Sequence, residues 1–260
     1  MQNPDMTFWE HLEILRISLV KIVIVTFVCT LVAFCFKNEM FDVILAPKND
    51  TFVTYRLINE IGQFVRLPLM PSFSVKLINT ELSEQFIVHM KAALYVGAFC
   101  ALPYILCLLF RFVSPALYTC ERKYTLWMMG GGYVMFVLGV TVCYFLIFPF
   151  TFRFLGTYQV SDEVENMITL QSYMSTFMMM LLTIGTVFEI PVLSWILAKL
   201  GILSADYMKI YRKHAFVIVM MIAAVITPTS DIFTLLLVAF PMYLLYEISI
   251  RIVKHINGCE

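Results

Sequence analysis

A carboxyl group inside an apolar segment is the first feature of this sequence that could do chemistry. Glu189 lies in the apolar stretch 170–198, two residues before Pro191. A charge at the centre of a membrane helix costs about 2.5–3.5 kcal/mol on insertion scales, so such residues usually face protein or water and serve a function. Proline cannot donate to the carbonyl four residues earlier, which predicts a kink. We therefore expect a polar break here; a protonated Glu189 bonded to a neighbouring helix is the structural alternative.

A second set of acids has the chemistry to bind a cation. Glu10 and Glu13 lie on a helical lead-in, and Glu121 precedes Arg122 and Lys123 in a polar segment. Carboxylates form forked, bidentate hydrogen bonds with guanidinium groups, so a patch of these acids would suit an arginine-bearing ligand. The alternative is that the N-terminal acids favour the helix dipole and that Glu121 lies in a solvated loop.

The composition places these residues in a membrane protein. The chain has 260 residues, of which 61% are hydrophobic and 14% are charged, and its mean hydropathy is +0.85. Soluble domains are about 45–50% apolar and about 25% charged. This composition argues against soluble enzymes, nucleic-acid-binding proteins and disordered scaffolds. Lysine plus arginine and aspartate plus glutamate number 18 each, so net charge says nothing about partners.

The apolar segments predict an all-α fold with six transmembrane helices. The runs do not alternate apolar and polar residues as membrane strands would. The first four segments reach the roughly 20 residues that cross a hydrocarbon core as helix. The fifth has only 13 residues and forms a short hairpin with the sixth. We predict spans at 17–36, 86–110, 126–150, 170–198, 214–226 and 232–250.

The placement of lysine and arginine indicates that both termini lie in the cytoplasm. The inner segments then carry ten of these residues, whereas the short outer segments carry one, Arg153. The outer loop 37–85 holds five, but long loops weigh little in the positive-inside rule. Its apolar stretches predict an ordered outer cap. We expect one integral membrane domain over 1–260, with a cytoplasmic lead-in 1–16, the cap 37–85, inner loops 111–125 and 199–213, and a tail 251–260.

We expect no enzyme activity, no cofactor and no metal. The sequence has no nucleophile–base pair, no Gly-rich phosphate loop after a strand and no Cys/His cluster with zinc-ligand spacing. Two function classes stay open from the residues alone. One is an ion- or proton-coupled small-molecule transporter that uses Glu189 as its relay, and the other is a structural subunit that organises other membrane helices.

Five motifs follow one another along residues 8–248. They are FWEHLEILR (8–16), FVSPALYTCERK (112–123), VFEIPV (187–192), TPTSDIF (227–233) and PMYLLYEI (241–248). In order, they resemble the H-L-E-E-L-R lead-in, the first inner loop, the F-E-x-P of the fourth helix, the T-P-x-x-D outer turn and the P-M-x-x-L-[FY]-E of the last helix of the TatC family. Members of that family are the multispanning core subunits of twin-arginine protein translocases. Each motif is weak alone, but five in register are very specific.

The resemblance implies a six-helix, glove-like concave protein of the cell inner membrane that binds twin-arginine signal peptides. With single-span partners of the TatA and TatB type, it would export folded proteins using the proton-motive force, in a complex with further copies of itself. No nucleic acid is implied. The signal-binding acid maps to Glu121, with Arg122 beside it; the intramembrane acid maps to Glu189, with Pro191; and the outer turn maps to Pro228 and Asp231.

One position departs from the family pattern. The second glutamate of H-L-E-E-L-R, which is tied to signal binding, is Ile14 here. Glu13 matches the first glutamate, and Glu10 lies one turn earlier on the helix. We expect either that one of these acids binds the signal in place of the missing glutamate, or that Glu121 contributes more of the charge recognition.

The last two predicted helices contain two further polar features. Asp231 precedes the sixth helix, where it would cap backbone N–H groups. The functional alternative is that the short hairpin thins the membrane and eases the passage of folded cargo. Glu247 and Arg251 are spaced i,i+4 in the favourable order, which predicts a pair within the last helix.

Overall fold

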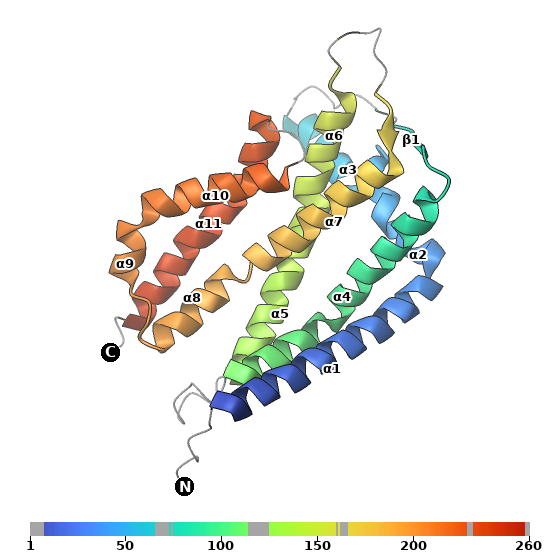
Figure 1. Ribbon diagram of the computed structural model, residues 1–260. Coiled ribbons are helices and arrows are strands. Elements are labelled where there is room, and N and C mark those ends of the chain that lie inside the picture. The colour runs from blue at the N-terminus through green and yellow to red at the C-terminus, as the bar shows by residue number, and fades with distance from the viewer. Residues whose placement is uncertain are drawn as a thin grey trace. The chain divides into compact units, whose positions relative to one another are not determined.

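The computed structural model describes residues 8–65, 73, 75–113, 125–159, 161, 166–227 and 231–257. These residues form helices and one pair of short strands (Figure 1). The helices are α1 (Phe8–Cys35), α2 (Lys37–Leu45), the 3₁₀ turn η1 (Ala46–Lys48), α3 (Val53–Val65), α4 (Glu84–Val113), α5 (Thr125–Val142), the π-helical turn η4 (Cys143–Ile147), α6 (Phe148–Thr157), α7 (Leu170–Val187), α8 (Ile190–Lys199), α9 (Ala205–Ile210), α10 (Arg212–Ile226) and α11 (Ile232–Asn257). The strands are β1 (Leu77–Ile78) and β2 (Ile168–Thr169).

Five helical stretches of the described residues are long and apolar enough to cross a membrane. They coincide with five of the predicted spans, which confirms the predicted class of an α-helical, polytopic membrane protein. The predicted span at 214–226 falls in α10, whose 15 residues give only about 22 Å of helix. The count of six spans and the orientation of the termini stay predictions. The five stretches are Leu12–Cys35, Glu84–Leu108, Gly130–Thr157, Leu170–Lys199 and Ile232–Ile256.

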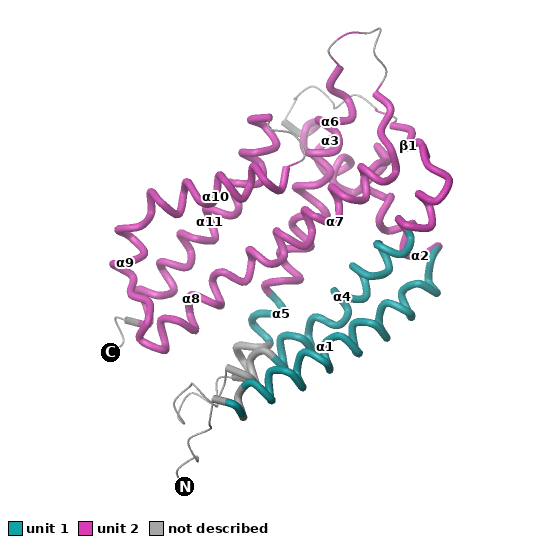
Figure 2. Tube along the Cα trace, viewed as in Figure 1, with its two compact units in different colours: residues 1–37, 89–134 teal, residues 38–88, 135–260 magenta. Residues whose placement is uncertain are grey.

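The chain divides into two compact units, which Figure 2 shows in different colours. Unit 1 comprises residues 1–37 and 89–134, and unit 2 comprises residues 38–88 and 135–260. In unit 1, α1 and α4 approach closely, because a Cβ atom added to Gly97 would lie 2.7 Å from the Cα atom of Thr30. Among the described side chains of α1, only Ala33 is buried. From residue 22 to residue 35 the exposed side chains of this helix are all apolar, whereas Glu13, Arg16 and Lys21 are exposed in its first half.

The segment 37–85 of unit 2, which we expect to be an ordered cap, contains α2, η1, α3 and β1. An aromatic cluster fixes it to the helices of the same unit. The ring of Phe52, just before α3, stacks on Phe145 with centroids 5.7 Å apart and meets Tyr144 edge-on at 5.5 Å. Arg153 of α6 lies over the ring of Tyr55, with its guanidinium carbon 5.6 Å from the ring centroid. Burial, partly offset by Arg153, raises the pKa of Tyr55, so its hydroxyl stays protonated.

Of the five membrane stretches, Leu170–Lys199, which begins with α7, has the largest buried share. Two close contacts with α5 hold the C-terminal half of α7. A Cβ atom on Gly139 would lie 2.7 Å from the ring of Phe188, and one on Gly185 would lie 2.8 Å from the ring of Phe136. Since each glycine receives an aromatic ring from the opposite helix, α5 and α7 pack more closely than larger residues would allow. The buried residues of α7 are Tyr173, Met174, Phe177, Met178, Met180, Leu181, Ile184, Gly185 and Val187.

A second apolar cluster in unit 2 joins α8, α9 and the C-terminal part of α11. Ala198, Met208 and Val253 are buried in it together with Ala205, Ile250 and Ile256. Helix α9 begins at the N-cap residue Ser204, whose hydroxyl accepts a hydrogen bond from the backbone N–H of Tyr207. This cluster positions the short helix α9 against α8 and α11.

Candidate functional site

The predicted polar break is present in the fourth membrane stretch. Helix α7 ends at Val187 and α8 begins at Ile190, with Phe188 and Glu189 in a turn between them. Pro191 has no N–H, so the carbonyl of Val187 loses its α-helical donor. Just before the proline, the backbone N–H of Glu189 bonds the carbonyl of Thr186, three residues earlier, at 3.1 Å, which is the pattern of a turn and not of an α-helix. The helix is therefore interrupted where the sequence predicts it.

The side chain of Glu189 is half-buried in unit 2 and its carboxyl group is not satisfied. Its Oε1 atom is buried and has no hydrogen-bond partner within the described part of the chain. A buried polar atom without a partner costs free energy, so this carboxyl group favours a donor supplied from outside the described residues. The polar contact that we predict for Glu189 stays a prediction.

Of the acids predicted to bind arginine, Glu13 is the one whose side chain the structure describes. It is exposed on α1, in unit 1. Glu10 is part of the same helix, but its side chain lies outside the described residues. Glu121 and Arg122 lie outside them altogether. An exposed carboxylate on Glu13 is accessible to a ligand cation, while the acidic patch as a whole stays a prediction.

Asp231 stands at the first turn of α11 and caps it. Its Oδ1 atom accepts the backbone N–H of Thr234 at 2.8 Å, and its other carboxylate oxygen accepts the Thr234 hydroxyl. This is the capping interaction predicted from the sequence. Pro228, the other residue predicted for the outer turn, lies outside the described residues.

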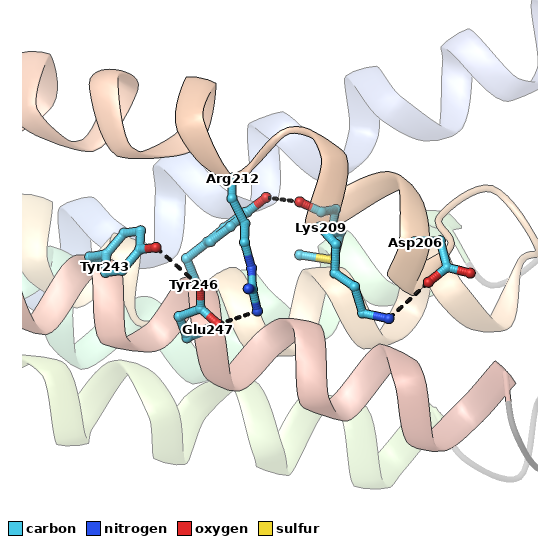
Figure 3. Close-up of polar contacts among 7 residues, drawn as sticks. Asp206, Lys209, Arg212, Tyr243, Tyr246 and Glu247 are labelled. Carbon is cyan, nitrogen blue, oxygen red and sulfur yellow. Dashed lines mark hydrogen bonds and ion pairs between the residues drawn. The ribbon is translucent and has the colours of Figure 1, made fainter.

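A polar cluster that the sequence analysis did not predict joins α9 and α10 to α11 (Figure 3). Arg212, at the start of α10, forms an ion pair with Glu247 of α11, with 2.8 Å between Nη2 and Oε2. The Tyr243 hydroxyl donates to the other oxygen of Glu247 at 3.1 Å. The Tyr246 hydroxyl donates to the carbonyl of Met208 in α9 at 2.8 Å. These contacts tie the short helix α10 to α11.

The ion pair corrects one prediction. The i,i+4 spacing predicts that Glu247 pairs with Arg251, whereas its carboxylate bonds Arg212, 35 residues earlier. Helical spacing reveals neighbours on one helix but not a cation that a turn brings alongside.

On the exposed side of α9, Lys209 bonds Asp206 at 2.8 Å. The hydrogen bond and charge of this ammonium group hold the pKa of the Asp206 carboxyl below its usual value.

A second acid that the sequence analysis missed is Glu84, the first residue of α4. Its exposed fraction is 1%. One carboxylate oxygen accepts the backbone N–H groups of Thr80 and Glu81 at 2.8 and 3.3 Å, and the other accepts that of Gln171 at the start of α7, at 2.8 Å. The parallel pairing of β1 with β2 brings these two helix starts together. An acid at the start of a helix is only a weak sequence signal for the contacts with the preceding residues Thr80 and Glu81. The contact with Gln171 cannot be predicted without the fold.

No group of three or more His, Cys, Asp or Glu residues that could hold a metal ion occurs among the described residues. What the geometry offers instead is an exposed acid on α1, an unsatisfied carboxyl group at a helix break and a capped short hairpin.

Comparison with known proteins identifies the family. A protein-family model described as "Sec-independent protein translocase protein (TatC)" matches residues 10–241. The protein of that name from Blattabacterium sp. subsp. Periplaneta americana (strain BPLAN) is 33% identical over 261 residues, which cover 98% of each chain. The one from Carboxydothermus hydrogenoformans is 32% identical over 260 residues, which cover 100% of this chain and 98% of the relative.

Solved structures agree with the sequence relatives. A crystal structure described as that of the twin arginine translocase receptor TatC has a TM-score of 0.77 at 28% identity, covering 95% of this chain and 100% of the other. A second one, in the detergent DDM, has a TM-score of 0.78 at 29% identity. Fold and sequence thus define a multispanning membrane component of a protein translocase. The chain belongs to the TatC family.

Proposed function

We propose that this chain is the signal-peptide receptor of a twin-arginine translocase and takes part in the export of folded proteins. The observation that carries the proposal is the family match over residues 10–241, together with solved relatives described as translocase receptors. The exposed carboxylate of Glu13 on α1 supports it, since it is free to meet a guanidinium group. The family match favours this function over the small-molecule transporter considered for Glu189.

In this proposal the paired arginines of the signal peptide bind an acidic patch on the cytoplasmic side. Glu121 makes the main contact, Glu13 and Glu10 supply the remaining charge, and Arg122 holds the loop. Charge-assisted, bidentate pairs of this kind are short and geometrically specific, which explains a preference for arginine over lysine.

The proposed setting is the cytoplasmic membrane, spanned six times, with both termini inside the cell. The α10–α11 hairpin is the fifth and sixth span, and the short α10 thins the bilayer locally. TatA-type and TatB-type single-span subunits are the proposed partners, further copies of this chain share the complex, and the proton-motive force drives export. The unsatisfied carboxyl group of Glu189 is a suitable acceptor for a polar group on a partner helix.

Site-specific crosslinking tests signal recognition. A photoreactive residue at position 121 or 13 is expected to crosslink a signal peptide that contains Arg–Arg, and to do so weakly when the pair is Lys–Lys. Equal crosslinking of both peptides would contradict guanidinium recognition. A photoreactive residue at Lys254, in the C-terminal part of α11, serves as the control position.

Substitution of Glu121 tests the same contact energetically. Loss of a hydrogen bond to a charged group costs about 1.5–3 kcal/mol, so Glu121→Ala is expected to lower signal affinity roughly ten- to a hundredfold. Glu13→Ala and Glu10→Ala are expected to have smaller effects, because the two acids together replace the glutamate that is Ile14 here, and each variant keeps one of them. Normal export of a twin-arginine reporter by the Glu121→Ala variant, at native expression in cells that lack their own component, would refute the assignment.

A further inference from the structure

Two prolines in unit 2 each remove the N–H group that would be the α-helical donor to a backbone carbonyl four residues earlier. Pro149 follows the π-helical turn η4, and the carbonyl four residues earlier is that of Phe145. Pro47 follows α2, and the carbonyl four residues earlier is that of Val43. Since proline has no N–H, neither carbonyl can receive the usual i to i−4 hydrogen bond. Phe145 lies in the third membrane stretch, where lipid supplies no donor, so its carbonyl must find one within the protein.

Each of these carbonyls receives a hydroxyl from the segment that contains the other proline. Thr54, at the start of α3, donates its hydroxyl to the carbonyl of Phe145. Tyr144, in the π-helical turn, donates its hydroxyl to the carbonyl of Val43 at 2.7 Å. The exchange is reciprocal: residues 43–54 supply a donor to the turn before Pro149, and that turn supplies a donor to the end of α2.

Two further hydroxyls flank the exchange. Tyr55, which is 1% exposed, donates to the carbonyl of Pro149 at 2.8 Å. Tyr173 of α7, which is 2% exposed, donates to the carbonyl of Ile44 at 2.8 Å. Val43 and Ile44 are among the last carbonyls of α2, which have no partners within their own helix. The tyrosines of two other helical segments therefore act as the C-terminal cap of α2.

We propose that these four hydroxyl-to-carbonyl hydrogen bonds form a proline-dependent latch, which holds the segment 38–55 on the third and fourth membrane stretches of unit 2. The competing explanation is that these are ordinary tertiary hydrogen bonds that owe nothing to Pro47 and Pro149.

A double-mutant cycle on the purified, full-length protein in detergent separates the two explanations. Thr54→Val removes the donor with little change in shape, and Thr54→Ser retains it as the matched control. Thr54→Val is expected to lower the thermal unfolding midpoint by roughly 3–8 °C, because the Phe145 carbonyl loses its hydroxyl donor. Pro149→Ala restores a backbone N–H four residues after Phe145. In that background Thr54→Val is expected to lower the midpoint by less than half as much.

The other arm of the latch gives an independent cycle. Tyr144→Phe removes the hydroxyl that Val43 receives, and Pro47→Ala restores the backbone donor. Hydrogen–deuterium exchange of the α2 amides is expected to rise roughly tenfold in Tyr144→Phe and to return towards the native rate in Tyr144→Phe with Pro47→Ala. If a variant of one arm does not fold, the other arm decides. Equal losses with proline and with alanine at position 149 or 47 would overturn the proposal.

Discussion

Two glutamates at helix starts have opposite environments in this molecule. Glu84, at the start of α4, is buried and accepts three backbone N–H groups from two chain segments. Glu189, at the start of α8, has a buried oxygen with no hydrogen-bond partner among the described residues. Both lie in unit 2, and both lie where the helix dipole favours a negative charge. They differ in whether the chain itself provides the donors.

The difference separates a structural acid from one that is available for binding. A carboxylate that uses its oxygens on backbone N–H groups fixes two helix starts together and has little capacity left for a ligand. A carboxyl group that the fold leaves unsatisfied is kept at a cost, which is typical of groups that act on a partner or a proton. Four substitutions test this contrast through the thermal unfolding midpoint of the purified protein.

The largest effect is expected from Glu84→Ala. It leaves the N–H groups of Thr80, Glu81 and Gln171 without an acceptor in a site closed to water, so the midpoint is expected to fall on the order of 10 °C. Glu81→Ala is the matched control, because it removes a neighbouring, exposed carboxylate and keeps the backbone N–H. Similar midpoints for the two variants would show that Glu84 does not hold α4 and α7 together.

The second effect concerns the packing that holds the break at Glu189. A Cβ atom on Gly139 would lie 2.7 Å from the ring of Phe188, so Gly139→Ala forces that ring to move. Overpacking of this kind costs about 1–3 kcal/mol, and the midpoint is expected to fall by roughly 3–8 °C. Gly131→Ala, on the same helix, would meet nothing within 4 Å. It is expected to be neutral or slightly stabilising, and a loss equal to that of Gly139→Ala would contradict the packing argument.

A smaller effect is expected at Asp231, which is intermediate between the two glutamates. Its carboxylate caps α11 through one backbone N–H and one hydroxyl, both of Thr234. Asp231→Ala removes a helix cap worth about 1 kcal/mol, so the midpoint is expected to fall by about 2–4 °C. Asp231→Asn keeps an acceptor and is expected to lose less. A neutral Asp231→Ala would show that the hairpin does not depend on its cap.

Local sequence signals predicted the parts of the molecule that depend on near neighbours. Apolar runs predicted five membrane stretches, Pro191 predicted the break beside Glu189, and the position of Asp231 predicted its cap. Each of these follows from residues within one or two helical turns. The sequence analysis missed or wrongly assigned the polar contacts between distant segments, because these contacts depend on residues far apart in the sequence.

Glu84 and Glu247 illustrate what the sequence could not show. The donor from Gln171 lies 87 residues from Glu84, and Arg212 lies 35 residues from Glu247. Neither separation along the sequence corresponds to a helix or strand repeat. Only the folded chain therefore reveals which donor meets which acid. The hydroxyls that satisfy the carbonyls before Pro47 and Pro149 likewise come from about a hundred residues away.

The smallest effect on stability is expected from Glu189→Gln, and it tests the contrast most directly. Since the described part of the chain supplies no donor to the buried oxygen of Glu189, a neutral amide of the same shape loses no hydrogen bond there, and the midpoint is expected to change by no more than about 2 °C. Glu84→Gln is the matched control; it places an amide N–H₂ group against backbone N–H groups and is expected to lower the midpoint clearly. Glu189→Leu is then expected to leave the purified chain folded but to reduce its co-purification with single-span subunits more than its signal binding. If Glu189→Gln lowers the midpoint as much as Glu84→Gln, both acids are structural and Glu189 is not held available for a partner.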